Sequence, residues 1–199
     1  MARNKAFDES DVLHKAMDVF WEKGYCATSM EDLVDRMGIN RASMYNTFGD
    51  KHQLFLEALN HYRRQQAHDM IALLEQSPSV KAAIQTLLHN VAQNNDCNNP
   101  KGCFIVNAAV EFFPKKDNKD EREAVLKIIR DNLATVETAL SAAIAKGQAS
   151  GEIKATQSPE ALAKFVLTTI NGMRVAERAG YEAPHYQAII QVIESVLFK

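Results

Sequence analysis

Cysteine is scarce in this sequence, and the few cysteines form no structural pattern. The 199 residues contain three cysteines, and no two of them make a CxxC pair. An odd number of cysteines without a secretion signal indicates free thiols rather than a disulfide framework. The lack of closely spaced zinc ligands argues against a structural zinc site. We therefore expect no metal site and no cofactor.

Long apolar runs and a strong net charge are also lacking. No stretch approaches the about 18 apolar residues that are needed to cross a bilayer, and the first residues show no apolar run followed by a cleavage site. We expect a cytoplasmic protein with no membrane partner. The net charge is −2. This balance argues against a non-specific nucleic-acid coat, but it is compatible with a protein that gathers a few basic groups on one face.

Alternating strand patterns are missing as well, whereas helical periodicity runs through the chain. The sequence therefore predicts an all-α fold. We expect a three-helix N-terminal domain in residues 1–52 and a larger helical domain in residues 53–199. A helix that starts at residue 51 would link the two domains.

The most informative stretch runs from Thr28 to Lys51 and predicts two short helices joined by a tight turn. Thr28 and Glu31 have the spacing of a capping box, which would start the first helix. Gly38 can take the left-handed conformation that ends a helix. The apolar stripe of this helix consists of Met30, Leu33, Val34 and Met37.

The second helix of this stretch is expected to begin after Asn40, which would be its N-cap. Met44 and Phe48 are four residues apart and would face inward, and Gly49 would end the helix. The opposite face would then be small, polar and aromatic. This arrangement is typical of a recognition helix that enters a DNA major groove. An ordinary pair of antiparallel helices with a solvated face is the alternative.

The residues of this region resemble a known family. The segment MYNTFGDKHQLF and the upstream segment AMDVFWEKGYCATSMEDLVDRMGINRASMY are similar to the tetracycline-repressor (TetR/AcrR) family of bacterial transcription regulators. The resemblance implies that residues 1–52 are a helix-turn-helix DNA-binding domain and that residues 53–199 are a helical effector-binding and dimerisation domain. It also implies a homodimer that binds a double-stranded DNA operator. It departs from the family at Asn46, where a second aromatic residue is usual, and at Thr47, where histidine is usual. The DNA contacts that it implies are Thr28, Arg41, Ala42, Ser43, Tyr45, Asn46, Thr47 and Lys51.

Further helices are predicted downstream, and one of them carries polar residues on an apolar face. After an asparagine-rich loop at residues 94–102, residues 102–113 form an apolar helix in which Asn107 and Glu111 lie four positions apart. Buried polar groups must be paired. These two side chains therefore either bond to neighbouring helices or face a ligand cavity.

The segment that begins at Gly102 also resembles the region that borders the effector pocket in one branch of the same family. This resemblance implies a small-molecule effector, and the apolar lining residues suggest a largely hydrophobic compound. Core packing would place the same residues inside the protein, and a solvated helix surface would account for the polar ones. The candidate ligand-binding residues are His61, Tyr62, Cys103, Phe104, Asn107, Glu111, Phe112 and Met173.

The resulting hypothesis is a ligand-responsive transcriptional repressor that releases a palindromic operator when a small molecule binds the C-terminal domain. Its dimer would pair the helix that begins at Pro159 with the long helix from Asp120 in a four-helix bundle. Two alternatives remain. Cys103 at a helix start near Lys101, or Cys97, could make the protein a thiol-based redox or electrophile sensor, although buried inert cysteine is common. The protein could also be a helical interaction module without DNA binding.

Catalytic motifs are lacking. The sequence contains no glycine-rich phosphate loop, no HExxH pair of metal ligands and no nucleophile motif. We therefore expect that the protein is not an enzyme.

Overall fold

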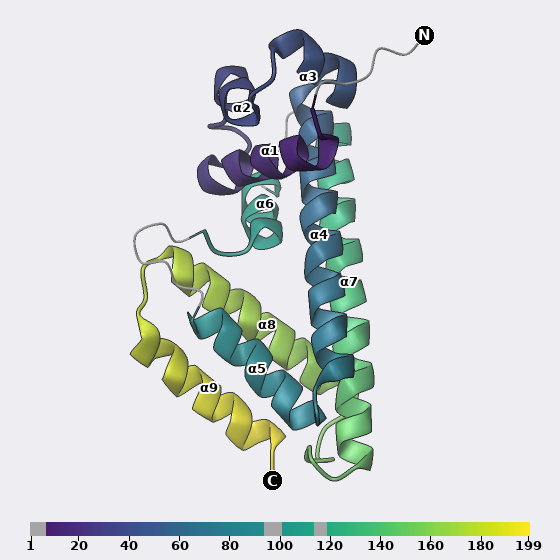
Figure 1. Cartoon of the computed structure of the whole chain (residues 1–199). Coiled ribbons are helices and arrows are strands. Elements are labelled where there is room, and N and C mark those ends of the chain that lie inside the picture. Colours follow the sequence, from purple (N-terminus) through teal and green to yellow (C-terminus); the bar gives the residue numbers. More distant parts are fainter. Residues whose placement is uncertain (1–6, 94–100, 114–118) are drawn as a thin grey trace. The chain divides into compact units, whose positions relative to one another are not determined.

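The computed structural model describes residues 7–93, 101–113 and 119–199, and these residues are almost entirely helical (Figure 1). The prediction of an all-α fold is confirmed. Within the described ranges, none of the helices is both long and apolar enough to cross a membrane. The helices are α1 (Glu9–Lys23), α2 (Met30–Met37), α3 (Arg41–Phe48), α4 (Lys51–Gln76), α5 (Val80–Gln93), α6 (Phe104–Phe112), α7 (Lys119–Ala149), α8 (Pro159–Arg178) and α9 (Ala183–Leu197).

The contacts divide the chain into two compact units. The first unit comprises Met1–Arg64 and Asn107–Ile129, and the second comprises Gln65–Val106 and Arg130–Lys199. Helices α4, α6 and α7 therefore each contribute residues to both units. The domain boundary after residue 52 stays a prediction, and the contacts group the end of α6 and the beginning of α7 with the N-terminal helices.

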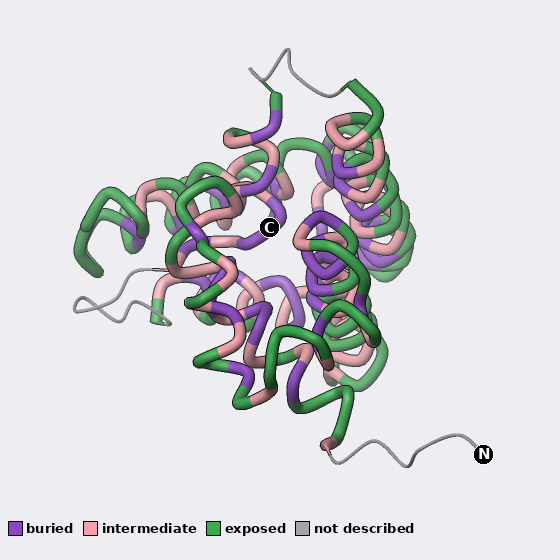
Figure 2. Tube along the Cα trace, turned by 90° about the horizontal axis from the view of Figure 1, so that it is seen from above, coloured by how far each residue is buried: buried purple, intermediate pink, exposed green. Residues whose placement is uncertain are grey.

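The first unit is built from α1, α2, α3, the beginning of α4, and parts of α6 and α7. Each of its N-terminal helices turns one apolar side inward, and Figure 2 shows buried and exposed residues following one another along the same helices. Helices α2 and α3 have only eight residues each, which is too short for stability in isolation. These two helices are stabilised by the burial of their apolar side chains. The buried apolar residues of α1 to α4 in this unit include Val12, Ala16, Met17, Phe20, Leu33, Met37, Met44, Phe48, Leu54, Phe55, Ala58 and Leu59.

The ends of α1 follow local sequence signals. The Asp8 carboxylate accepts hydrogen bonds from the N–H groups of Ser10 at 2.8 Å and Asp11 at 3.2 Å, so Asp8 is the N-cap. Gly24 ends the helix with φ +83°, a conformation that side chains with a Cβ rarely adopt.

The start of α2 differs from the prediction by one residue. Ser29, not Thr28, is the N-cap: its hydroxyl accepts from the Asp32 N–H at 3.0 Å, and Asp32 Oδ2 accepts from the Ser29 N–H at 2.8 Å. The sequence TSMED holds two overlapping frames with capping-box spacing, one led by Thr28 and one by Ser29. Thr28 does not cap because its hydroxyl is buried and donates to the Gly24 carbonyl at 2.6 Å.

The second unit has one apolar core, to which α5, α8 and α9 are central. These three helices pack against one another (Figure 1). Ser158 caps α8 by accepting from the Ala161 N–H at 3.2 Å, and Pro159 follows in the first turn as predicted. The predicted asparagine-rich loop lies mostly outside the described residues. The core consists of Ile84, Leu88, Val91, Leu140, Ile144, Ile153, Leu162, Ala163, Val166, Met173, Tyr186, Ile190, Ile193, Leu197 and Phe198.

The capping frame of α2 can be tested by substitution. Ser29→Ala should lower the free energy of unfolding by about 1 kcal/mol, because it removes the acceptor for the Asp32 N–H. Glu31→Ala is the matched control from the other frame and should change little, since Glu31 is exposed and forms no part of the cap. Urea denaturation at one protein concentration would measure both. The reverse order of effects would contradict the assignment.

Candidate nucleic-acid interface

Helices α2 and α3 are joined by a turn of three residues. Gly38 has φ 70° and ψ 25°, the left-handed conformation, and its N–H donates to the Val34 carbonyl at 3.0 Å. Asn40 then caps α3 through its side-chain oxygen, which accepts from the Ser43 N–H at 2.8 Å. The predicted end of α2 and the predicted cap of α3 are both confirmed. The pair has the short, tightly turned form of a helix-turn-helix.

The buried apolar side chains of α3 point inward, and its outer face is left to other residues. Met44 and Phe48 lie in the core, as the sequence predicts. Tyr45 is 44% exposed, and within the described part of the chain its hydroxyl makes no hydrogen bond. The remaining outer side chains are exposed or half-buried and carry no acidic group, so this face is open to a polyanionic partner. These side chains are Arg41, Ala42, Ser43, Asn46 and Thr47.

Lys51 lies in the first turn of α4, directly after the cap of that helix. Asp50 caps α4 by accepting from the Gln53 N–H at 2.8 Å. The Lys51 ammonium sits over the ring of Tyr25, with Nζ 4.6 Å from the ring centroid. Burial raises the pKa of Tyr25 to about 12, and the nearby carboxylates of Glu121 and Asp50 add to this shift. The phenol is therefore neutral near pH 7.

Thr28 is the one predicted DNA contact that the structure does not place at the surface. Its side chain is only 2% exposed, and its hydroxyl is bonded to the Gly24 carbonyl. The Thr28 side chain thus holds the turn between α1 and α2, and its predicted phosphate contact stays a prediction. Ser29 is the exposed residue at the start of α2.

Five of the predicted ligand-binding residues lie in the first unit. The His61 ring lies 6.1 Å from the His14 ring, and burial, followed by His14 and Arg64, lowers the pKa of His61. Tyr62 is buried against Trp21 at 5.0 Å. Asn107 is half-buried at the point where α6 enters this unit.

Glu111 is explained by protein structure rather than by a ligand. Its carboxylate accepts from the N–H of Tyr25 at 2.9 Å and from the N–H of Cys26 at 2.6 Å. Of the two alternatives for a polar group on this helix, bonding to a neighbouring element is the one observed. Phe112 is buried beside it, with its ring 5.1 Å from the Tyr25 ring.

The other three predicted ligand-binding residues lie in the second unit. Phe104 and Met173 are buried, and Met173 belongs to the core of that unit. Cys103 directly precedes α6 and is a half-buried free thiol. Cys97 lies outside the described residues. The eight candidates are thus divided between the two units. Within the described ranges, no cluster of three or more histidine, cysteine or acidic side chains is arranged to hold a metal ion.

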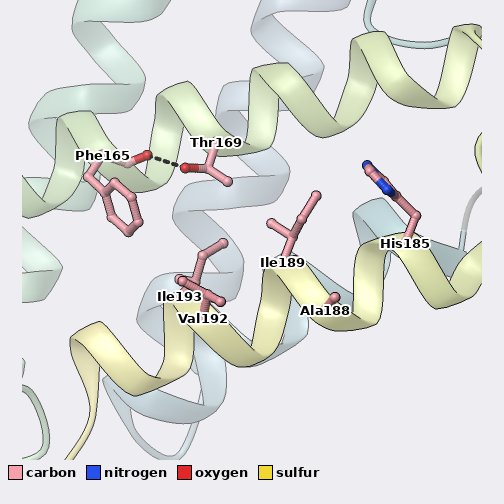
Figure 3. A pocket seen from close by; sticks show the side chains of 7 residues that line it. All are labelled: Phe165, Thr169, His185, Ala188, Ile189, Val192 and Ile193. Carbon is pink, nitrogen blue, oxygen red and sulfur yellow. Dashed lines mark hydrogen bonds between the residues drawn. The ribbon is translucent and has the colours of Figure 1, made fainter.

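An apolar groove between α8 and α9 was not predicted from the sequence. It has a volume of about 380 Å³ and none of the predicted ligand-binding residues lines it (Figure 3). Thr169 contributes little polarity to it, because its hydroxyl donates to the Phe165 carbonyl at 2.8 Å. The sequence did contain a signal for this groove, because α9 has more apolar residues than one inward-facing stripe needs. The lining residues are Phe165, Thr169, His185, Ala188, Ile189, Val192 and Ile193.

Comparison with known proteins agrees with this geometry. Residues 12–58 match the family described as bacterial regulatory proteins, tetR family, and residues 77–193 match the tetracyclin repressor-like C-terminal domain. The chain belongs to the TetR family. Its members are DNA-binding transcriptional regulators, and α2 and α3 form the helix-turn-helix of the N-terminal domain.

Two curated TetR-type relatives and one solved structure show how far the similarity extends. The transcriptional repressor ComR of Escherichia coli K12 is 32% identical over 89% of this chain and 83% of its own length. An uncharacterized regulator of Bacillus subtilis, YezE, is 42% identical, but the match spans only 57% of this chain and 59% of that relative. The cysteine-substituted TetR regulator CifR, in complex with 26-bp operator DNA, is 30% identical with a TM-score of 0.82 and covers 98% of this chain and 99% of its own.

The electrostatics of α2 lead to a pH-dependent prediction. A hydrogen bond from Lys23, followed by hydrogen bonds from the backbone and hydroxyl of Ser29, lowers the pKa of Asp32 well below its ordinary value of 3.8. A carboxyl with a lowered folded-state pKa contributes stability above its unfolded pKa, and this contribution is lost as the pH falls towards the folded value. Asp32→Asn should therefore be less stable than the wild type at pH 7, and the gap should narrow below about pH 4.

Asp35→Asn is the matched control on the same helix, because Asp35 is exposed and makes no such bonds. Its difference from the wild type should stay small at every pH. Thermal unfolding across this pH range would measure both variants. An Asp32→Asn gap that does not change with pH would contradict the role given to the carboxylate.

Proposed function

We propose that this protein is a ligand-responsive repressor that binds a palindromic operator as a homodimer and releases it when a small molecule binds the C-terminal domain. The observation that carries the proposal is the outer face of α3, which is exposed, polar and free of acidic groups while Met44 and Phe48 hold the helix to the core. The operator complex of CifR supports the same role for the corresponding region. We assign the protein no catalytic activity and place it in the cytoplasm with the DNA it regulates.

We propose specific roles for the exposed residues of this surface. The first turn of α3 would read base edges, and the side chains at its N-terminal end are the ones that reach them. Tyr45 and Lys51 would contact phosphates, as a phenol and an ammonium commonly do in protein–DNA complexes. The predicted readers are Arg41, Ala42 and Ser43, and Asn46 and Thr47 are further predicted DNA contacts on the same helix.

We place the effector in the second unit. Phe104 and Met173 would supply apolar contacts there, and Cys103 lies beside the start of α6. The ligand would act by binding the conformation that does not bind DNA more tightly. A 100-fold preference corresponds to roughly 2.7 kcal/mol, which is enough to release an operator.

A double substitution tests the DNA-binding surface. The variant Tyr45→Ala/Lys51→Ala should bind selected genomic operator fragments on the order of 100-fold more weakly, because charge-assisted contacts are lost in both subunits. Lys146→Ala, which removes an exposed lysine near the end of α7, is the control and should bind as the wild type does. Binding would be measured by fluorescence anisotropy, with the dimer checked by sedimentation. Unchanged affinity in the double variant would refute the assignment.

We propose that the groove between α8 and α9 is covered by the same two helices of a second copy. Phe165, Val192 and Val196 are large apolar side chains that are 38%, 59% and 39% exposed on these helices. Exposed apolar patches of this kind are typical of protein interfaces, and dimerisation is typical of the family. This proposal replaces the pairing of α8 with α7, because the exposed large apolar residues lie on α9 and not on α7.

A charge placed in this face tests the dimer. Val192→Glu should weaken dimerisation by on the order of 100-fold or more, because the carboxylate would be buried without a partner. Val110→Glu alters an even more exposed valine on α6 and should leave the dimer intact. Sedimentation equilibrium would give both dissociation constants. A Val192→Glu protein that stays dimeric at the wild-type concentration would place the interface elsewhere.

A further inference from the structure

The side chain of Tyr25 lies between the end of α6 and the lysine that begins α4. Its ring is 5.1 Å from the Phe112 ring of α6 and 5.0 Å from the Phe55 ring of α4. The Lys51 ammonium lies over the same ring, 4.6 Å from its centroid. One aromatic side chain therefore touches both α6 and the basic group at the proposed DNA surface.

The position of Tyr25 is fixed by a carboxylate from α6. Glu111 accepts hydrogen bonds from two successive N–H groups, those of Tyr25 and Cys26, one on each carboxylate oxygen. Charged acceptors make the stronger hydrogen bonds of proteins. Tyr25 and Glu111 are 86 positions apart in the sequence, so the bond joins two distant segments of the first unit.

The backbone beside Tyr25 is shaped for this carboxylate. A Cβ on Gly24 would lie 3.1 Å from Glu111 Oε2, and Gly24 also has φ +83°. Only glycine meets both conditions without strain. The carboxylate of Glu111 thus packs closely against the backbone of the turn after α1.

A lysine over an aromatic face is attracted by the ring, and this attraction limits where the ammonium can go. Lysine otherwise has a long side chain with many rotamers, and ordering it on DNA costs conformational entropy. A ring that already holds the ammonium near the start of α4 reduces that cost. Residues that hold the Tyr25 side chain in position therefore also influence how easily the Lys51 ammonium contacts a phosphate.

We propose that Tyr25 is a positioning residue for operator binding, which holds Lys51 in place for its phosphate while Glu111 holds Tyr25 from α6. The inference rests on the proposed function, since it requires Lys51 to contact DNA.

The salt dependence of operator affinity tests this role. Each phosphate contact adds about 0.9 to the slope of log affinity against log salt, so Lys51→Ala should flatten the slope by about 1.8 in a dimer. Tyr25→Leu should flatten it by a similar amount, and the double variant should flatten it no further than Lys51→Ala alone. Tyr25→Phe keeps the ring and should keep the wild-type slope. Trp21→Leu, which removes an aromatic ring that packs against Tyr62 in the same unit, is the matched control and should also keep it.

A second measurement needs no DNA and covers the case in which Tyr25→Leu folds poorly. In NMR spectra of lysine-labelled protein, the side-chain signals of Lys51 should be shifted upfield by the Tyr25 ring. Glu111→Gln should reduce this shift, because an amide can satisfy only one of the two N–H groups. Trp21→Leu should leave the shift unchanged, and Lys51→Ala would assign the signal.

Several outcomes would overturn the inference. Fold-losses for Tyr25→Leu and Lys51→Ala that multiply in the double variant would show that the two residues act separately. The inference would also be overturned if Tyr25→Leu kept the wild-type salt dependence of operator affinity. It would be overturned as well if Glu111→Gln left the NMR signals of Lys51 unchanged. A wild-type slope in Lys51→Ala would instead refute the proposed phosphate contact, and the inference would fall with it even if the NMR shift were present.

Discussion

Helices α2 and α3 are too short to exist without their neighbours, and this constraint governs the DNA-binding half of the molecule. Eight residues give little more than two turns, so intrahelical hydrogen bonds cannot offset the cost of nucleation. Leu33, Met37, Met44 and Phe48 supply the missing stability by burying their side chains. Their inward orientation also determines which residues of α3 face outward, so the packing of the core and the composition of the DNA surface are set by the same helical phase.

The two proposed interaction surfaces of the chain are chemically different. The outer face of α3 is polar and small, which suits base edges and phosphates. The face of α8 and α9 is apolar, with Phe165 and Val192 partly open to solvent. A hydrophobic face is suited to a protein partner and a polar one to nucleic acid, so one chain can use both at once.

Local signals in the sequence predicted several helix ends. Gly38, Asn40 and Gly49 lie where expected, since a cap depends on residues three or four positions away. The start of α2 was missed by one residue because two neighbouring frames had the same spacing. Only the burial of the Thr28 hydroxyl against Gly24 decides between them, and burial is not visible in a local pattern.

Long-range contacts were beyond what the sequence could predict. The carboxylate of Glu111 was recognised as a polar group that needs partners, but those partners are backbone N–H groups far away in the chain. Backbone groups carry no residue-specific signal, so no motif could identify them. The groove on α9 was missed for a related reason: apolar periodicity shows that a face is hydrophobic but not whether it is covered by the same chain.

The fit between Gly24 and Glu111 bears on how this regulator can be re-engineered. In a randomised library across the turn after α1, a side chain at residue 24 would meet two separate difficulties, the left-handed backbone and a tight contact with the carboxylate. A smaller residue at position 111 would remove the contact with the carboxylate but would leave the unfavourable backbone conformation at residue 24. Directed evolution of new operator preferences can therefore vary the residues on the outer face of α3, whereas Gly24 should be left unchanged.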